Sequence, residues 1–96
     1  MITVIADHVV NAGQMDAANK IFEEVTASAK KAKGLASRSI IVSQKDANRI
    51  ITVTNWDSQE AFDAWRKVRK FTFDAAHLHK VFSKEVVENY NVAKKV

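Results

Sequence analysis

The first ten residues alternate between two faces, a pattern with a period of two. Ile2, Val4, Ala6, His8 and Val10 fall on one face, and Thr3, Ile5, Asp7 and Val9 fall on the other. This period is typical of a β-strand, because neighbouring side chains of a strand point to opposite sides. The pattern predicts a strand over residues 2–10, ended by a turn at residues 11–13.

The following segment changes to a helical period. Between residues 14 and 33, apolar side chains recur every three or four positions, at Met15, Ala18, Phe22, Val25, Ala29 and Ala32. Such a stripe is typical of an amphipathic helix of about five turns. Gly34 follows the stripe and is expected to cap the C-terminus of this helix.

Two β-branched runs then occupy residues 37–44 and 49–56, with a short polar connection between them. A connection of this length predicts a hairpin of two antiparallel strands. A second helix is expected to follow, with Asp57 as its N-cap and Glu60 completing a capping box. Its inward stripe consists of Ala61, Phe62, Trp65 and Val68.

A further helical piece at residues 71–79 and a strand at 84–92 complete the order β-α-β-β-α-β. This order predicts an α+β, ferredoxin-like fold, in which both helices cover one face of an antiparallel sheet. The other face would carry Ile5 and Val9 and is too apolar to be left in water. We therefore expect a homodimer in which two sheets face each other and enclose a barrel.

The composition limits the possible chemistry. A chain of 96 residues without cysteine predicts one domain, residues 1–96, and excludes thiolate nucleophiles, disulfides and cysteine metal sites. No apolar run approaches the roughly 18 residues of a membrane span. The start at Met1 also lacks the cationic residues of a signal peptide. These features predict a cytoplasmic protein with no membrane contact.

The formal net charge is +4, and it is concentrated in three basic clusters: Lys30-Lys31-Ala32-Lys33, Arg66-Lys67-Val68-Arg69-Lys70 and Lys94-Lys95. Charge runs are usually solvated surface. Aromatic residues do not alternate with basic ones on any predicted strand, as an RNA-binding sheet requires. We expect no nucleic-acid partner. The sequence also lacks the glycine-rich phosphate loops and the HExxH pattern, which argues against nucleotide and zinc-protease chemistry.

Trp65 and His77 are two candidates for a ligand site. Trp65 lies on the inward helical stripe, where a tryptophan is more often part of the core. His77 and His79 cannot bind one metal together, because residues two apart on a helix point about 200° apart. The small neighbours Ala75 and Ala76 favour His77 as the residue facing a flat ligand. His77 is then either a structural histidine bonded to a carbonyl or an axial ligand of haem iron.

The first strand supplies two further candidates. His8 falls on the predicted helix-facing side among apolar neighbours, where a polar group needs a partner or a ligand. Asp7 falls on the opposite side and could act as a base if it were desolvated, although a salt bridge is the commoner arrangement. The strand residues Ser37, Ser39 and Ser43 have no neighbouring pattern of histidine and aspartate, so a serine triad has no support.

Several segments together resemble one family: Val10-Asn11-Ala12-Gly13, Lys33-Gly34-Leu35, Thr54-Asn55-Trp56 and Ser58-Gln59-Glu60-Ala61-Phe62-Asp63-Ala64-Trp65. Over nearly its whole length, the chain resembles the antibiotic-biosynthesis-monooxygenase superfamily of dimeric α+β barrels. The pairing of Trp65 with Ala75-Ala76-His77 is narrower and resembles the IsdG-type haem-degrading monooxygenases.

The narrower resemblance implies a haem site. In that branch a helix tryptophan stacks on the haem and a histidine ligates the iron, roles that would fall to Trp65 and His77. Haem would be substrate and cofactor together, and ring opening would need dioxygen and an external electron donor. The residues expected to bind haem are His77, Trp65, Phe62, Arg66 and Arg69, with the arginines near the propionates.

One element of that pattern is missing. The branch uses an asparagine on the first strand, but a count back from Gly13 without gaps reaches Ala6. His8 is the next residue on the same face, so His8 is expected to act with Trp65 in catalysis. The interval between Trp65 and His77 is also longer than in the usual pattern.

Two alternatives remain open, because one fold hosts many functions. The first is a cofactor-free oxygenase of a small aromatic substrate, with His8 or Asp7 as its base. The second is a non-catalytic dimer that binds haem or another small ligand.

Overall fold

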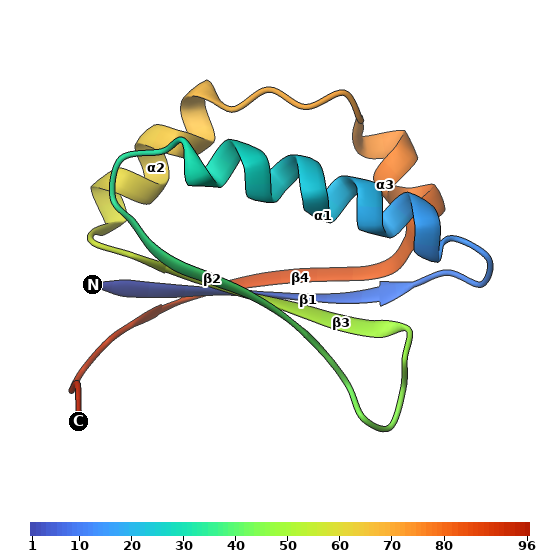
Figure 1. Cartoon of the computed structure of the whole chain (residues 1–96), viewed down its shortest axis with the longest axis horizontal. Helices are drawn as coiled ribbons and strands as arrows, with labels where there is room; N and C mark the ends of the chain where they lie inside the picture. The colour runs from blue at the N-terminus through green and yellow to red at the C-terminus, as the bar shows by residue number, and fades with distance from the viewer.

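The computed structural model of the protein describes residues 1–96. In chain order its elements are β1 (Ile2–Val10), α1 (Met15–Lys30), β2 (Leu35–Val42), β3 (Arg49–Trp56), α2 (Gln59–Val68), α3 (Ala75–Val81) and β4 (Phe82–Asn91). The strands form one sheet in the order β2-β3-β1-β4, and the helices lie on one side of it (Figure 1). Every strand pair is antiparallel. The α+β, ferredoxin-like fold expected from the sequence is confirmed.

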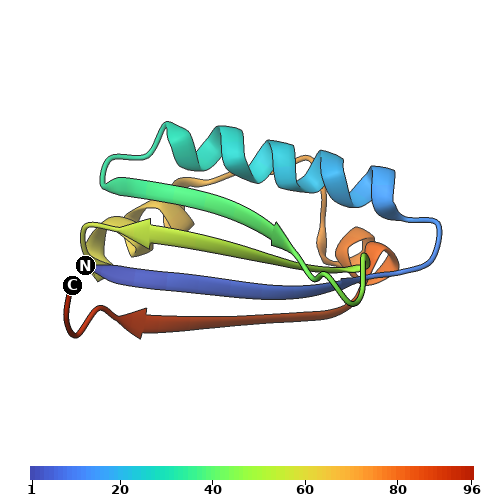
Figure 2. The ribbon, with the colours of Figure 1, turned by 60° about the horizontal axis from the view of Figure 1, so that its bottom comes forward.

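β1 is an inner strand, paired with β3 on one side and β4 on the other. The two faces predicted from its alternation are confirmed: Val4 and His8 are buried under the helices, whereas Ile5 and Val9 lie on the other side and stay partly accessible. Figure 2 shows the four strands side by side, with α2 and α3 near opposite ends of the sheet. Each of these helices therefore covers a different part of β1.

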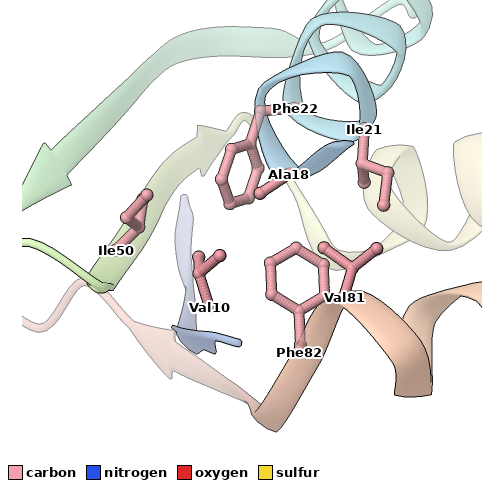
Figure 3. Packing of buried hydrophobic residues seen from close by; sticks show 7 residues of the cluster. All are labelled: Val10, Ala18, Ile21, Phe22, Ile50, Val81 and Phe82. Atoms are coloured by element: carbon pink, nitrogen blue, oxygen red, sulfur yellow. The ribbon is translucent and has the colours of Figure 1, made fainter. Parts of the chain in front are cut away.

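The apolar side chains between sheet and helices form two separate clusters. The first consists of Val10, Ala18, Ile21, Phe22, Ile50, Val81 and Phe82 (Figure 3). The second consists of Ile2, Val4, Ala29, Trp56, Phe62 and Trp65. α3 contributes Val81 to the first cluster and α2 contributes two aromatic rings to the second, so the middle of the sheet lies between two apolar ends.

The prediction that Gly34 caps the first helix was wrong. α1 ends at Lys30, and Gly34 lies in the following turn with φ of +97°. A Cβ atom on Gly34 would lie 2.6 Å from the Cβ of Ala61. The Gly34 carbonyl also accepts a hydrogen bond from the backbone N–H of Asp57 at 2.8 Å. A glycine is needed at this turn because it packs directly against the first turn of α2.

The predicted cap of the second helix was wrong by one residue. Ser58, not Asp57, is the N-cap of α2, and its hydroxyl accepts a hydrogen bond from the N–H of Ala61 at 3.1 Å. Because the cap moves by one position, Ala61 takes the place that Glu60 would need in a capping box. Asp57 stays in the turn and bonds to Gly34 through its backbone.

The last two elements begin and end at different residues from those predicted. α3 begins at Ala75 because the side chain of Asp74 caps it, accepting a hydrogen bond from the N–H of His77 at 2.9 Å. Residues 71–74 belong to the connection from α2, in which the rings of Phe71 and Phe73 stack 4.8 Å apart. β4 follows α3 directly at Phe82, and β2 begins at Leu35, two residues earlier than predicted.

No helix covers the other face of the sheet (Figure 1). Its apolar residues include Ile5, Val9, Ile41, Ile51, Val53 and Val86. No helix in the structure combines the length and apolarity needed to cross a membrane.

Candidate functional site

Polar side chains occupy the middle of the helix-facing side, between the two apolar clusters. They are His8, Arg38, Thr52 and Thr54. Arg38 donates from Nε to the hydroxyl of Thr26 at 2.8 Å and from Nη1 to the hydroxyl of Thr54 at 3.1 Å. These bonds tie α1 to β2 and β3. Burial lowers the pKa of the Arg38 guanidinium, which nevertheless stays cationic at neutral pH.

The helices leave part of this side uncovered at the edge strand β4. Val87 lies opposite Ala6 and is 55% exposed, and its neighbours Glu85 and Asn89 on the same face are also exposed. We call these four residues, Ala6, Glu85, Val87 and Asn89, the open stretch. The helix-facing side of β4 is therefore accessible to solvent at this point.

His8 lies at one end of the open stretch and is only 6% exposed. Its ring packs between Phe22 and Phe82, with centroid distances of 5.1 and 5.0 Å. Nδ1 lies 3.2 Å from the carbonyl oxygen of Ile50, and Nε2 lies 3.5 Å from a carboxylate oxygen of Glu85. The polar partner that the sequence required for His8 is thus supplied by the chain itself.

Glu85 joins this buried histidine to the solvent, because its own side chain is 40% exposed. The hydrogen bond with His8 holds the pKa of Glu85 below its usual range, although partial burial works in the opposite direction. The charges of His8, Arg69 and His79 lower it further. Three cationic or ionisable groups therefore surround one carboxylate at the edge of the open stretch.

Trp65 is 7% exposed and belongs to the second apolar cluster. Its indole lies 5.3 Å from that of Trp56 and 6.2 Å from the ring of Phe62. Its Nε1–H donates to the hydroxyl of Ser28 on α1 at 3.0 Å. The bond fixes the orientation of the ring and links α2 to α1. By contrast, the indole N–H of Trp56 is buried without a partner.

Two arginines lie over aromatic rings: Arg66 in α2, and Arg69, the C-cap residue of that helix. The Arg69 guanidinium lies 4.6 Å from the centre of the Trp65 ring and 5.4 Å from that of Phe71. Arg66 lies 5.3 Å from the ring of Phe62, which is itself buried in the second cluster. Burial lowers the pKa of Arg69, and the charge of Arg66 adds to this effect. These contacts place Phe62, Trp65, Arg66 and Arg69 side by side.

The histidines of α3 occupy different surroundings. His77 is exposed, and its imidazole forms no hydrogen bond or ion pair within the chain. His79 is also exposed, but its charge acts on Glu85. Of the two histidines, only His79 is among the charges that lower the pKa of Glu85. Neither histidine contributes to the groove beside Trp65.

Asp7 lies on the opposite face of the sheet, as predicted, and is held in an ion pair. Arg49 contacts its carboxylate at 2.9 Å and Lys84 at 3.7 Å. The hydrogen bond from Arg49 is the main cause that lowers the pKa of Asp7. A carboxylate stabilised in this way is a weak base. Asp7 is therefore a salt-bridge residue and is poorly suited to act as a general base.

A groove of about 640 Å³ runs between α1 and α2 on the outer side of the helices. Its wall contains Ser28 and Trp65, the two residues joined by the indole hydrogen bond. Its cationic residues are Lys31, Lys33, Arg69 and Lys70. The groove is lined by residues of α1 and α2 and of the segments that follow them, whereas the open stretch belongs to β1 and β4. The two are separate surfaces.

The sequence model for antibiotic biosynthesis monooxygenases matches residues 1–73. The chain belongs to this family. Among curated proteins, no sequence matches this monooxygenase-family chain.

Solved structures share the family fold at low sequence identity. SnoaB, a cofactor-independent oxygenase from Streptomyces nogalater, is 14% identical with a TM-score of 0.83, over 99% of this chain and 95% of its own. Rv0793 from Mycobacterium tuberculosis is 14% identical with a TM-score of 0.85, over 98% and 96%. A mutant of MhuD with two manganese protoporphyrin IX molecules per active site is 20% identical with a TM-score of 0.75, over 100% and 98%. These likenesses support the fold of this family member.

Two residues of the candidate site were missed from the sequence. Glu85 sits in a polar strand, and Ser28 sits in a helix of ordinary amphipathic pattern. Only the register that places Glu85 opposite His8, and the packing that brings Ser28 to Trp65, reveals them. The signal for Glu85 was a charged residue on the helix-facing side of an edge strand. This signal can be recognised only when the pairing register of that strand is known.

Proposed function

We propose that this monooxygenase-family chain degrades haem, opening the porphyrin ring with dioxygen and electrons from an external donor. The observation that carries the proposal is the fixed indole of Trp65, stacked with aromatic rings and Arg69, on the helix that precedes Ala75-Ala76-His77. A rigid aromatic surface on α2 and a free imidazole on α3 are the two kinds of group that a large flat ligand with a bound metal would use.

The donor groups of the chain suit haem. The imidazole of His77 is accessible and free of internal partners, and neutral imidazole is the common axial donor to haem iron. Arg66 and Arg69 offer guanidinium groups to the two propionates. Ala6 and Val87 give the open stretch an apolar surface. When bound, haem would supply the iron at which dioxygen is activated.

Each residue then has a defined role in the proposal. Trp65 packs against the ligand, and Ser28 keeps its ring from rotating. His77 binds the metal, and Arg66 and Arg69 hold the carboxylates at the surface. Nε2 of His8 lies 3.5 Å from the Glu85 carboxylate at the edge of the open stretch, and His8 would take the hydrogen-bonding role of the missing asparagine.

Hemin titration followed by ascorbate in air tests the proposal. Wild type should develop the Soret band of ligated haem and then lose it under reductant and oxygen. His77→Ala should prevent the ligated spectrum while the protein stays folded by circular dichroism. The matched control His79→Ala removes an imidazole from the same helix and should keep the band.

The same titration can refute each part. No Soret change on hemin addition would remove haem as the ligand. Identical spectra for wild type and His77→Ala would remove His77 as the axial ligand. A stable Soret band under reductant and oxygen would leave a haem-binding protein without the degrading activity.

A second candidate is a cofactor-independent oxygenase that acts on a small aromatic substrate. The observation that favours it is the His8–Glu85 pair, an acid–base arrangement that needs no metal to remove a substrate proton. Oxygen uptake with an electron-rich phenol in the absence of hemin would support this reading, and no uptake would remove it.

We also propose that two copies associate through the uncovered sheet face. The apolar side chains on that face include Ile51 and Val53 in the inner strand β3, where no helix shields them from water. Association would bury this surface and complete the expected barrel. Sedimentation equilibrium would reveal the dimer, and a monomer at every concentration would refute it.

A further inference from the structure

The contacts of His8 determine which of its nitrogens can exchange a proton. A carbonyl oxygen can only accept a hydrogen bond, so the contact with Ile50 requires that Nδ1 carries a hydrogen. The rings of Phe22 and Phe82 pack against the imidazole and oppose its rotation. Nε2 is therefore the nitrogen whose proton can be gained or lost, and it faces Glu85.

The burial of His8 separates it from water. Its side chain is 8% exposed, whereas that of Glu85 is 40% exposed. Water and dissolved ligands thus meet the carboxylate first. Ala6 lies next along the same face of β1 and presents only a methyl group beside the pair.

Charged groups from α3, from the end of α2 and from β1 itself act on the pair. Arg69 follows α2 and His79 belongs to α3, and both lower the pKa of Glu85 by their charge. Asp7 precedes His8 in β1 and is itself influenced by the charge of His8. The charges of α3 and of the end of α2 therefore act on the carboxylate of the pair.

We propose that Glu85 is a positioning residue for His8 and passes protons between its Nε2 and the solvent. In this step a hydronium ion gives a proton to a carboxylate oxygen of Glu85, leaving water, and Glu85 passes that proton to Nε2. The Nε2–H bond then breaks as the proton moves to an acceptor atom bound over Ala6, leaving the lone pair on Nε2. No electron is transferred, and the carboxylate returns to its anionic form.

This role deepens the proposed function, because ring opening of haem and oxidation of an aromatic substrate both require proton transfers. The proposal can nevertheless be tested on the protein alone. Glu85→Gln keeps the size of the side chain but removes its charge and its ability to carry a proton. Glu88→Gln is the matched control, because Glu88 lies in the same strand on the opposite face and binds only the hydroxyl of Tyr90.

Nitrogen-15 NMR of the imidazole measures the pair directly. In Glu85→Gln the His8 ring resonances should shift, and exchange of the Nε2 proton with water should slow by about tenfold, since general acid–base transfer is lost. In His8→Gln the carboxyl carbon of Glu85 should titrate closer to its ordinary pKa, because the hydrogen bond that lowers it is gone. Glu88→Gln should match wild type in the His8 signals.

Turnover supplies the second readout. Glu85→Gln should keep hemin affinity within a few fold and slow the loss of the Soret band, and Glu85→Asp should restore part of the rate. Unchanged His8 exchange in Glu85→Gln would overturn the proton-passing role, whatever the activity. Altered exchange with no haem degradation in wild type would keep the pair and refute only the proposed reaction.

Discussion

The two tryptophans of the second cluster give a sharp test of the packing around Trp65. Both indoles are buried, but only that of Trp65 has a hydrogen-bond partner, the hydroxyl of Ser28. Trp65→Phe and Trp56→Phe remove similar numbers of apolar atoms from the same cluster. The two variants differ mainly in the indole N–H that is removed, which is hydrogen-bonded in Trp65 and unpaired in Trp56.

The expected costs follow from this difference. Loss of apolar contact and the cavity left behind should destabilise each variant by about 1 to 2 kcal/mol. Trp65→Phe also loses a hydrogen bond of about 1 kcal/mol. Trp56→Phe instead removes a buried donor without a partner, which returns about 1 to 3 kcal/mol of desolvation cost. Trp56→Phe should thus be nearly neutral and Trp65→Phe clearly destabilising, by about 2 to 3 kcal/mol in total.

Urea unfolding followed by far-ultraviolet circular dichroism at one protein concentration measures these free energies without relying on tryptophan fluorescence. A double-mutant cycle of Trp65→Phe with Ser28→Ala should give a coupling of about 1 kcal/mol. Equal destabilisation by Trp56→Phe and Trp65→Phe, together with zero coupling to Ser28, would refute the conclusion that this hydrogen bond fixes the Trp65 ring.

Three further predictions concern the fold. Gly34→Ala should destabilise the protein by about 2 kcal/mol or more, because φ is positive at this position and the new Cβ meets Ala61. Gly13→Ala, where the new Cβ has open space, should lower the free energy of unfolding by only about 1 kcal/mol. Equal effects of the two variants in urea unfolding would contradict the close contact at Gly34. Val53→Lys should dissociate the proposed dimer in sedimentation, since a charge would be buried at the interface, while Val68→Lys on exposed α2 should not. The pKa values of Asp7 and Glu85 are lowered from ordinary values of 3.8 and 4.5, so their stabilising effect is present above those values and is lost as pH falls through the folded pKa. Urea midpoints should therefore drop in acid, and the drop should be smaller in Asp7→Asn; the same drop in both proteins would remove the ion pair as its cause.

Local patterns in the sequence were enough to predict the order of elements and the side of the sheet on which each β1 residue lies. The period-two alternation placed His8 under the helices and Asp7 on the open face, because side chains of a strand must alternate. The helical stripe likewise placed Phe62 and Trp65 in the core. It was wrong for Val68, which lies in the last turn of α2 and is 74% exposed. Exact ends of helices were less well determined, as the cap of α2 shows, since adjacent polar residues such as Asp57 and Ser58 can both serve as caps.

Only the tertiary structure decided which distant residues meet. The register of β1 with β4 brought Glu85 to His8 across 77 positions of the chain, and helix packing brought Ser28 to Trp65. Local patterns cannot encode these contacts, because a shift of one residue in strand register would turn Glu85 to the opposite face. The helix period predicted that His77 and His79 point in different directions, and only the fold puts the charge of His79 among those that lower the pKa of Glu85.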